Sequence, residues 1–556
     1  MRPTTYQFIF TEFFILHSAF CTLHPLPISL FPNSGPGNIS SAFSYNFSGG
    51  FSMRISKVVF IKNALILTVS SLIIRFIGMF FRIWLAGAVG SEGMGLYTQI
   101  FSFYVLASAF ASAGINTAVT RLVSEELANG NPKGVRKILT KCIIVTLFVA
   151  LFSTIIIYFG ADFISERLIG DPRATESIKT LTFSLPFMGL SSCLKGYFIA
   201  RKKSAPGGSA QIFEQLARIG IIVYIFSRRA AAGIGEACRW VILGDGLAEV
   251  CSFLYIYVAY LFDKRKNLPK KVGCSPPYSV LSRLRHIALP ITVGRYLNSI
   301  LRTAESLIVP KKLAESGMSA ADSLSVFGVI KGMALPLIFF PASFLSALST
   351  LLIPEMSEAA AKNQSYKVKS TVSRCINITL FTALPISVIF FYASKELGII
   401  FYHDPSSGEM IKLLAPIIPL MYLDSVCDGL LKGLDQQVFI FRNSMTDSAL
   451  RLGLIMVLLP RFGLAGFIGI MYLSNAFTCV LNLSRLIKIS GAEFSFLKRV
   501  IFPGVTALTV GTISFLFLEK LHLSSVPFAL LLSAITVLLY GVIAIKCGFI
   551  TRDDIT

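Results

Sequence analysis

The sequence predicts an all-α integral membrane protein. Hydrophobic residues make up 54% of the 556 residues and charged residues only 14%, and the mean hydropathy is +0.71. Soluble domains do not have this composition. A helix needs about 20 mostly apolar residues to cross a bilayer. We therefore predict about fourteen transmembrane helices, centred near residues 73, 106, 150, 186, 219, 250, 298, 338, 385, 421, 450, 473, 508 and 534.

The formal net charge of +22 is distributed asymmetrically along the chain. If the N-terminus lies inside, the predicted cytoplasmic segments hold 31 Lys and Arg and the predicted outer loops hold 12. Basic residues concentrate in cytoplasmic loops, so this asymmetry predicts a multi-pass protein with both termini in the cytoplasm. The basic charge then indicates contact with anionic membrane lipids rather than with nucleic acid.

The chain contains an internal repeat. "RFIGMFFR" carries Arg75 and Arg82 seven residues apart, and a second pair with this spacing, Arg295 and Arg302, follows about 220 residues later. Segments "LKGYFIARKKSAPGGSAQIFEQLARIG" and "LKGLDQQVFIFRNSMTDSALRLG" also match in order. Each copy would hold six helices, and because six is even the copies run in parallel.

The repeat predicts two six-helix lobes followed by two further helices. The first residues differ from the rest, and "MRISKVVFIKNALIL" from Met53 reads as a compact start, so the segment before it is expected to be a disordered extension or an incorrectly assigned start. The predicted divisions are an extension (1–52), a first lobe with helices 1 to 6 (53–262), a cytoplasmic linker (263–279), a second lobe with helices 7 to 12 (280–490), and helices 13 and 14 with a cytoplasmic tail (491–556).

The repeated arginines are the first candidates for a site. Seven residues at 100° each return to within about 20° of the same helix face, so Arg75 lies over Arg82, and Arg295 over Arg302. An arginine facing lipid at mid-helix costs about 2.5 to 3.5 kcal/mol. Either these side chains snorkel or pair locally, or they line a hydrated cavity and bind an anion such as pyrophosphate, which guanidinium groups hold in bidentate fashion.

Other charged residues of the apolar windows recur four positions apart. Two such pairs combine an acid with an arginine and predict an intrahelical ion pair or a gating element. In a third pair both residues are acidic. These two acids either couple transport to an ion or proton or are hydrated residues near a helix end. The three pairs are Glu214 with Arg218, Asp447 with Arg451, and Asp424 with Asp428.

The sequence contains no signature of a familiar enzyme. We find no G-x-x-x-x-G-K-[ST] loop, no G-x-S-x-G and no H-E-x-x-H. The ten cysteines and five histidines are scattered, which predicts neither a metal site nor a disulfide framework. We expect no cofactor. A membrane-embedded glycan polymerase would need a site in an outer loop, and the predicted outer loops are short.

The motifs resemble those of a transporter family. At "RFIGMFFRIWLAGAVGSEGMGLYTQ", "SAGINTAVTRLVSEELANGN", "GMALPLIFFPASFLSALSTLLIPEMSEA" and "LLPRFGLAGFIGI", the chain is similar to the stage V sporulation protein B and polysaccharide flippase branch of the multidrug/oligosaccharidyl-lipid/polysaccharide exporter superfamily. The lipid II flippase MurJ is a more distant relative in this superfamily. Lys331 stands where that relative has further charges in helix 8, and only apolar residues follow it.

The resemblance implies a flippase that moves undecaprenyl-pyrophosphate-linked oligosaccharide or lipid II across the cytoplasmic membrane by alternating access. Arg75, Arg82, Arg295 and Arg302 would then receive the pyrophosphate. The alternative is an ion-coupled multidrug exporter of the same superfamily that depends on Asp424 or Asp428. A monomer is expected, with the lipid-linked glycan as substrate and cell-wall synthases as partners in wall, cortex or polysaccharide synthesis.

Overall fold

The described part of the chain is helical. The computed structural model describes residues 49–112, 114–228, 231–267 and 279–549, and no strand occurs among them. Residues 1–48 of the predicted extension and most of the predicted linker 263–279 lie outside this part. An all-helical chain satisfies its backbone hydrogen bonds within each segment, which the apolar interior of a bilayer requires.

The first lobe comprises the helices before residue 268. They are α2 (Gly49–Ser112), α3 (Ile115–Ala128), α4 (Pro132–Phe159), α5 (Ala161–Phe163), α6 (Thr175–Thr182), α7 (Leu185–Ala200), α8 (Ala205–Arg228) and α9 (Ile234–Asn267), with the short turns η1 (Ile164–Ile169) and η2 (Pro172–Ala174) between α5 and α6.

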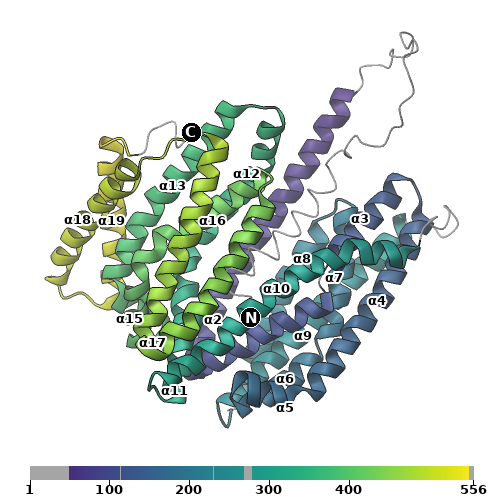
Figure 1. Cartoon of the computed structure of the whole chain (residues 1–556), viewed down its shortest axis with the longest axis horizontal. Coiled ribbons are helices and arrows are strands. Elements are labelled where there is room, and N and C mark those ends of the chain that lie inside the picture. Colours follow the sequence, from purple (N-terminus) through teal and green to yellow (C-terminus); the bar gives the residue numbers. More distant parts are fainter. Residues whose placement is uncertain (1–48, 113, 229–230, 268–278, 550–556) are drawn as a thin grey trace.

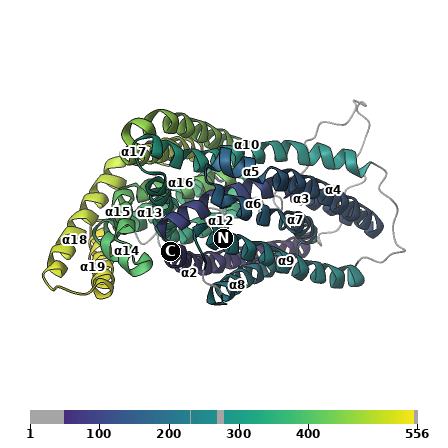
Figure 2. The same cartoon turned by 90° about the horizontal axis from the view of Figure 1, so that it is seen from below.

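The second lobe comprises the helices from residue 280 to residue 490. They are α10 (Val280–Glu315), α11 (Ala320–Phe327), the π-helical turn η3 (Gly328–Ala334), α12 (Leu335–Ala361), α13 (Ser365–Tyr392), α14 (Ser394–Tyr402), α15 (Pro405–Leu414), η4 (Ala415–Ile417), α16 (Ile418–Gly433) and α17 (Gln437–Ser490). The turn η5 (Leu497–Ile501), α18 (Phe502–Glu519) and α19 (Ser525–Lys546) follow. Figures 1 and 2 show α18 and α19 at the outer edge of the second lobe, away from α3 to α9.

Two of the longest helices are broken at a glycine. The backbone of Gly90 in α2 has φ 72° and ψ −179°, and that of Gly463 in α17 has φ 52° and ψ −131°. Residues with a Cβ atom rarely adopt a backbone conformation with positive φ, whereas glycine adopts it readily. Each break joins two helices that the sequence predicts separately, helices 1 and 2 in α2 and helices 11 and 12 in α17.

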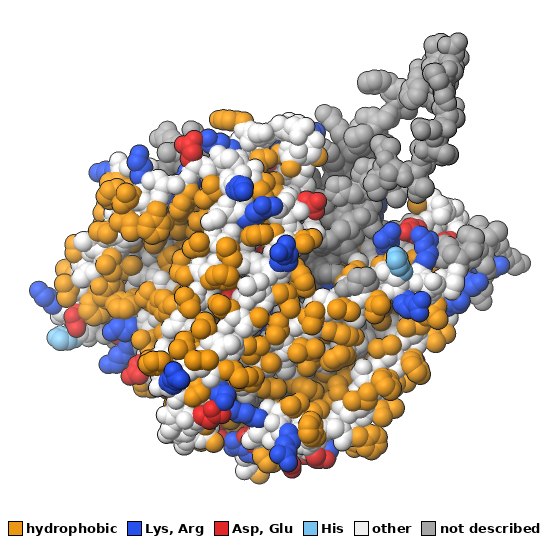
Figure 3. All heavy atoms as spheres, in the orientation of Figure 1, with side chains coloured by type: hydrophobic (Ala, Val, Ile, Leu, Met, Phe, Trp, Pro, Cys, Tyr) orange, Lys and Arg blue, Asp and Glu red, His pale blue; other side chains and the backbone are white. Residues whose placement is uncertain are grey.

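The described residues contain ten helical stretches long and apolar enough to span a membrane. The stretch Thr68–Ala128 and the stretch Gln437–Ser490 each include one of the glycine breaks. The predicted all-α membrane fold is therefore confirmed, and the number fourteen stays a prediction. Figure 3 shows hydrophobic side chains over most of the visible face, with most Lys and Arg around its edges and several more within its upper part.

The two lobes share one hydrophobic core at one end of the molecule and have separate cores at the other end. In one half, a single cluster joins both lobes, with members such as Leu85 and Val241 from the first and Phe327 and Tyr422 from the second. In the other half, the first lobe has its own cluster around α3, α4, α7 and the end of α9, which the start of α10 joins, and the second lobe has another around α12, α13, α16 and α17. The lobes are thus fastened together at one end and packed largely independently at the other.

Candidate functional site

A cavity of about 220 Å³, lined by charged, neutral polar and apolar side chains, lies between the lobes. Its walls come from α2 and α8 of the first lobe and from α10, η3, α12, α16 and α17 of the second. One water needs about 10 to 15 Å³ of such volume, so the cavity has room for many waters. Charged side chains that face it keep access to water and avoid most of the cost of burial in an apolar medium.

The α2 wall carries two arginines on one face. Arg75, Gly78 and Arg82 all line the cavity, as their spacing along the helix predicts. Arg75 is half-buried and Arg82 is 9% exposed. The Nη1 atom of Arg82 donates a hydrogen bond of 3.4 Å to the backbone carbonyl of Lys331 in the other lobe.

The turn η3 brings Lys331 into the cavity. Its π-helical winding adds a residue to one turn, and such bulges occur frequently at functional sites. The backbone of Gly328 also lies so close to α2 that a Cβ atom there would be 2.1 Å from the carbonyl oxygen of Ser91. The side chain of Lys331 forms an ion pair with Glu305 of α10, with 2.9 Å between Nζ and Oε1.

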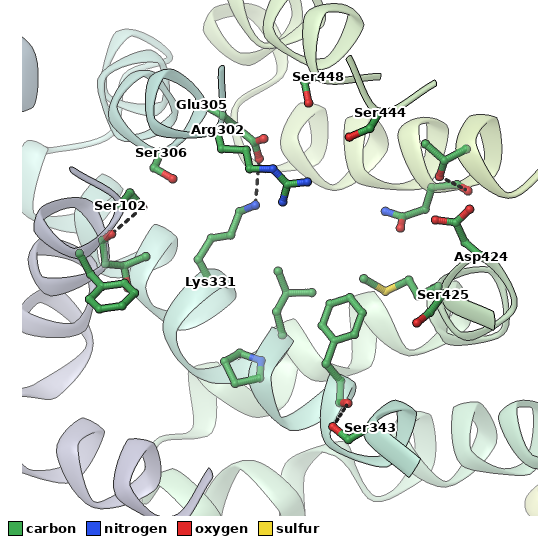
Figure 4. A pocket seen from close by; sticks show the side chains of 18 of the residues that line it. Ser102, Arg302, Glu305, Ser306, Lys331, Ser343, Asp424, Ser425, Ser444 and Ser448 are labelled. Carbon is green, nitrogen blue, oxygen red and sulfur yellow. Dashed lines mark hydrogen bonds and ion pairs between the residues drawn. The ribbon is translucent and has the colours of Figure 1, made fainter. Parts of the chain in front are cut away.

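Helix α10 supplies one of its two predicted arginines to the cavity. Arg302 lines it and donates from Nε to Asn298 Oδ1 at 2.6 Å, one turn earlier on the same helix. Figure 4 shows Arg302 and Lys331 reaching in beside Glu305, with Asp424 and Ser425 across the cavity from them. Arg295, which the sequence places at the same site, is not among the lining residues. It lies two turns, about 10 Å, nearer the start of α10.

A chain of ionic contacts continues from Glu305 into α17. Its Oε1 atom lies 3.5 Å from Nη1 of Arg451, whose Nη2 atom pairs with Asp447 Oδ2 at 2.9 Å and donates to Ser474 Oγ at 2.6 Å. Ser474 in turn donates to Asp447. The i, i+4 spacing of Asp447 and Arg451 thus gives an ion pair on one helix face, and both residues line the cavity.

The acidic pair of α16 is partly neutralised by neighbouring side chains. Asp428 forms an ion pair with Lys432 at 2.5 Å, again at i, i+4. Asp424 accepts a hydrogen bond of 2.9 Å from Asn482 Nδ2, and Asn482 Oδ1 accepts one of 2.9 Å from Asn443. Both carboxylates line the cavity. Among the described residues, no group of three or more His, Cys, Asp or Glu side chains could hold a metal ion.

The corresponding pair of the first lobe lies behind the cavity wall. Glu214 and Arg218 form an ion pair at 3.1 Å, but neither is among the lining residues; Gln215 is. The side chain of Arg218 is 5% exposed and also pairs with Asp245 of α9 at 3.0 Å. Tyr97 of α2, which does line the cavity, donates to Asp245 at 3.3 Å. This network joins three helices of one lobe.

The structure assembles more polar groups than the sequence alone singles out. Seven predicted site residues line one cavity: Arg75, Arg82, Arg302, Asp424, Asp428, Asp447 and Arg451. Sequence reasoning missed Glu305 and Asp245, and mentioned Lys331 without assigning it to the site. A carboxylate inside an apolar window is itself a signal of function or pairing, and this signal could have found both acids.

Family models and curated proteins match most of the chain. The model described as "Polysaccharide biosynthesis protein" matches residues 60–359, and the model described as "MatE" matches residues 313–457. Stage V sporulation protein B of Bacillus subtilis (strain 168) is 26% identical over 416 residues, which cover 74% of this chain and 80% of that protein. Lipid II flippase MurJ of the same strain is 22% identical over 420 residues, which cover 68% and 73%.

A solved structure shares the fold. The structure of lipid II flippase MurJ in an inward closed conformation superposes with a TM-score of 0.66 at 13% sequence identity, and the match covers 86% of this chain and 98% of that one. At this identity the likeness concerns the arrangement of the helices and not the chemistry of the cavity.

Proposed function

Because the chain belongs to the polysaccharide biosynthesis protein family, we propose that it is a flippase for a polyprenyl-pyrophosphate-linked glycan such as an undecaprenyl-pyrophosphate oligosaccharide or lipid II. Lipid II flippase MurJ is among its relatives, and the chain is a multi-pass membrane transporter of the multidrug/oligosaccharidyl-lipid/polysaccharide exporter superfamily rather than an enzyme. The resemblance read from the sequence motifs is confirmed. The lipid-linked substrate would cross the membrane by alternating access.

The cations that line the inter-lobe cavity carry this proposal. Arg75, Arg82 and Arg302 lie with Lys331 around one space between the lobes. A cation at mid-helix costs about 2.5 to 3.5 kcal/mol if it faces lipid, which accounts for their position around a hydrated space, and an anionic ligand would give the cations a function there. Guanidinium groups match phosphate oxygens in pairs and stay charged at cellular pH. Pyrophosphate is therefore the ligand chemistry that this wall fits.

A second wall of the cavity supports a sugar component. Helices α16 and α17 contribute neutral hydrogen-bonding side chains, which can both donate to and accept from sugar hydroxyls. Together with Arg302 on the opposite side, they would receive the glycan while the arginines hold the pyrophosphate. The neutral side chains of this wall are Ser425, Asn443, Ser444, Ser448, Asn475, Thr478 and Asn482.

The uneven core supports alternating access. The cluster shared by both lobes closes one end of the molecule, whereas largely separate clusters leave the lobes less constrained at the other. Basic residues concentrate at the end with separate clusters, in the segments 121–141 and 355–374. By the positive-inside rule this end would face the cytoplasm and let a substrate enter from the inner leaflet, and the cytoplasmic position of both termini stays a prediction.

The remaining parts of the proposal concern the surroundings of the protein. Its basic cytoplasmic segments would contact anionic lipids. Cell-wall synthases would consume the glycan on the outer side, and a single chain would suffice because the cavity is formed within it.

Depletion of the protein tests this function directly. Lipid-linked precursors would be extracted from depleted cells and assigned to a leaflet by the access of a membrane-impermeant glycosidase. We expect one pyrophosphate-linked glycan to accumulate on the inner leaflet. Unchanged precursor pools and distribution after depletion would contradict the assignment.

An ion-coupled multidrug exporter is the second candidate. The MatE model matches residues 313–457, and Asp424 and Asp428 face the cavity within that range. This function predicts efflux of organic cations that is lost in the variant Asp424→Asn. Efflux that is absent, or that persists in this variant, would favour the flippase.

A further inference from the structure

Glu305 is the acid that faces the cationic side of the cavity. It lies on α10 one turn after Arg302, its side chain is 11% exposed, and it lines the cavity. Its Oε1 atom is 2.9 Å from Lys331 Nζ and 3.5 Å from Arg451 Nη1. One carboxylate oxygen thus bridges cations from η3 and α17.

The other cavity acids are committed to partners away from Lys331. Asp447 is held by Arg451 and Ser474, and Asp428 is held by Lys432, which does not line the cavity. Asp424 accepts from an asparagine. Glu305 alone among these four carboxylates pairs with a lining lysine, and the backbone carbonyl of that lysine accepts from Arg82.

A phosphate oxygen would make the same contacts as this carboxylate. Both groups present anionic oxygens that accept charge-assisted hydrogen bonds from ammonium and guanidinium groups. Lys331 and Arg451 would repel each other across this space if Glu305 were neutral, because charges of one sign at close range in a partly buried site are unfavourable. The carboxylate therefore balances the cavity while no ligand is bound.

We propose that Glu305 is a built-in counter-anion that the pyrophosphate of the substrate displaces from Lys331. This inference rests on the proposed function. Lys331 exchanges one anion for another, so its ammonium group stays paired whether the headgroup binds or leaves. Because the headgroup must displace Glu305, it binds more weakly than it would to a lysine without a counter-anion. Arg451 remains beside Glu305 and keeps the displaced carboxylate paired. Return of Glu305 to Lys331 then assists release of the headgroup.

The variant Glu305→Gln tests the displacement. Purified protein in detergent would be titrated with undecaprenyl pyrophosphate that carries no sugar, and transport of a fluorescent lipid-linked disaccharide would be followed in proteoliposomes. We expect affinity for the pyrophosphate to rise about tenfold, within the usual range of coupling between two ligands. The maximal transport rate should fall, because release is slower.

Asp428→Asn is the matched control, since it removes one carboxylate from the same cavity without touching Lys331. Its affinity for the probe should change much less than that of Glu305→Gln. In the background Lys331→Gln, the change Glu305→Gln should lose most of its effect. If Glu305→Gln does not insert stably, Glu305→Asp serves instead, because the shorter side chain weakens the contact with Lys331 and should raise affinity to a smaller extent.

The outcomes separate this inference from the proposed function. One case is that the wild-type protein binds the probe and that replacement of Arg75 abolishes this binding. Unchanged or weaker affinity in Glu305→Gln and Glu305→Asp would then overturn the displacement but not the proposed function. A wild-type protein that binds no polyprenyl pyrophosphate would overturn the function itself. An equal gain in Asp428→Asn would show a general effect of charge and also contradict the role of Glu305.

Discussion

The guanidinium of Arg82 in the first lobe donates a hydrogen bond of 3.4 Å to the backbone carbonyl of Lys331 in the second lobe. The side chain of the same lysine pairs with Glu305. A single residue of η3 thereby connects the arginine face of α2 to the ionic chain of α10 and α17. The two lobes are therefore in contact through the side chains that we propose bind the substrate.

Replacing Arg82 by Lys should reduce transport by about tenfold or more. The ammonium group keeps the charge, but it lacks the planar fork that can bind phosphate while it also bonds the carbonyl of Lys331. The comparison is Arg121→Lys, at an exposed residue that pairs with Glu125 outside the cavity and should transport normally. Equal rates for the two variants in proteoliposomes would refute a role for the guanidinium.

Alanine at Gly95 should open the closed end of the molecule. A Cβ atom there would lie 2.1 Å from the carbonyl oxygen of Leu324, and one at Gly328 would lie 2.1 Å from that of Ser91. Overpacking of this kind costs about 1 to 3 kcal/mol. It would destabilise the closed conformation, in which these backbones are in contact. Labelling of a cysteine at Ser325 by a membrane-impermeant reagent should become faster.

Gly87→Ala provides the comparison for this effect, because nothing lies within 4 Å of a Cβ atom at that position of the same helix. It should leave the labelling rate unchanged. Protection that persists in Gly95→Ala would show that the close approach is not needed for closure.

Neutralising Asp245 should destabilise the first lobe. The variant Asp245→Asn removes an acid that forms an ion pair with the buried Arg218, and loss of one partner from a buried pair costs about 3 to 5 kcal/mol. The melting temperature in detergent should fall clearly. Glu125→Gln removes an acid from exposed pairs and should shift it little, because such pairs contribute at most about 1 kcal/mol. Similar melting temperatures for both variants would contradict the structural role of Asp245.

Features that depend on the periodicity of a single helix could be predicted from the sequence. Long apolar windows located the helices, and the i, i+4 spacing of Asp447 and Arg451 located an ion pair. The pair of Lys331 and Glu305 was not predictable in this way. These residues are 26 positions apart in two different helical segments, and that separation along the sequence does not indicate how close their side chains lie.

Arg295 shows a second limit of helix periodicity. A seven-residue spacing fixes the face on which Arg295 and Arg302 lie but not their depth along α10, and α10 extends well beyond the cavity. The sequence predicts a helix on each side of the breaks in α2 and α17, but it does not predict that the breaks fall at Gly90 and Gly463. A glycine in an apolar run is compatible with a continuous helix, and only the surrounding packing selects positive φ.

The most direct measurement is the rate at which reconstituted protein moves a fluorescent undecaprenyl-pyrophosphate-linked disaccharide between leaflets, read by quenching of the outward-facing label. Arg75→Ala should abolish this transport in protein that inserts normally. Arg442→Ala, at an exposed residue of α17 outside the cavity, should leave it intact. Undiminished transport by Arg75→Ala would contradict the claim that the cavity arginines receive the pyrophosphate.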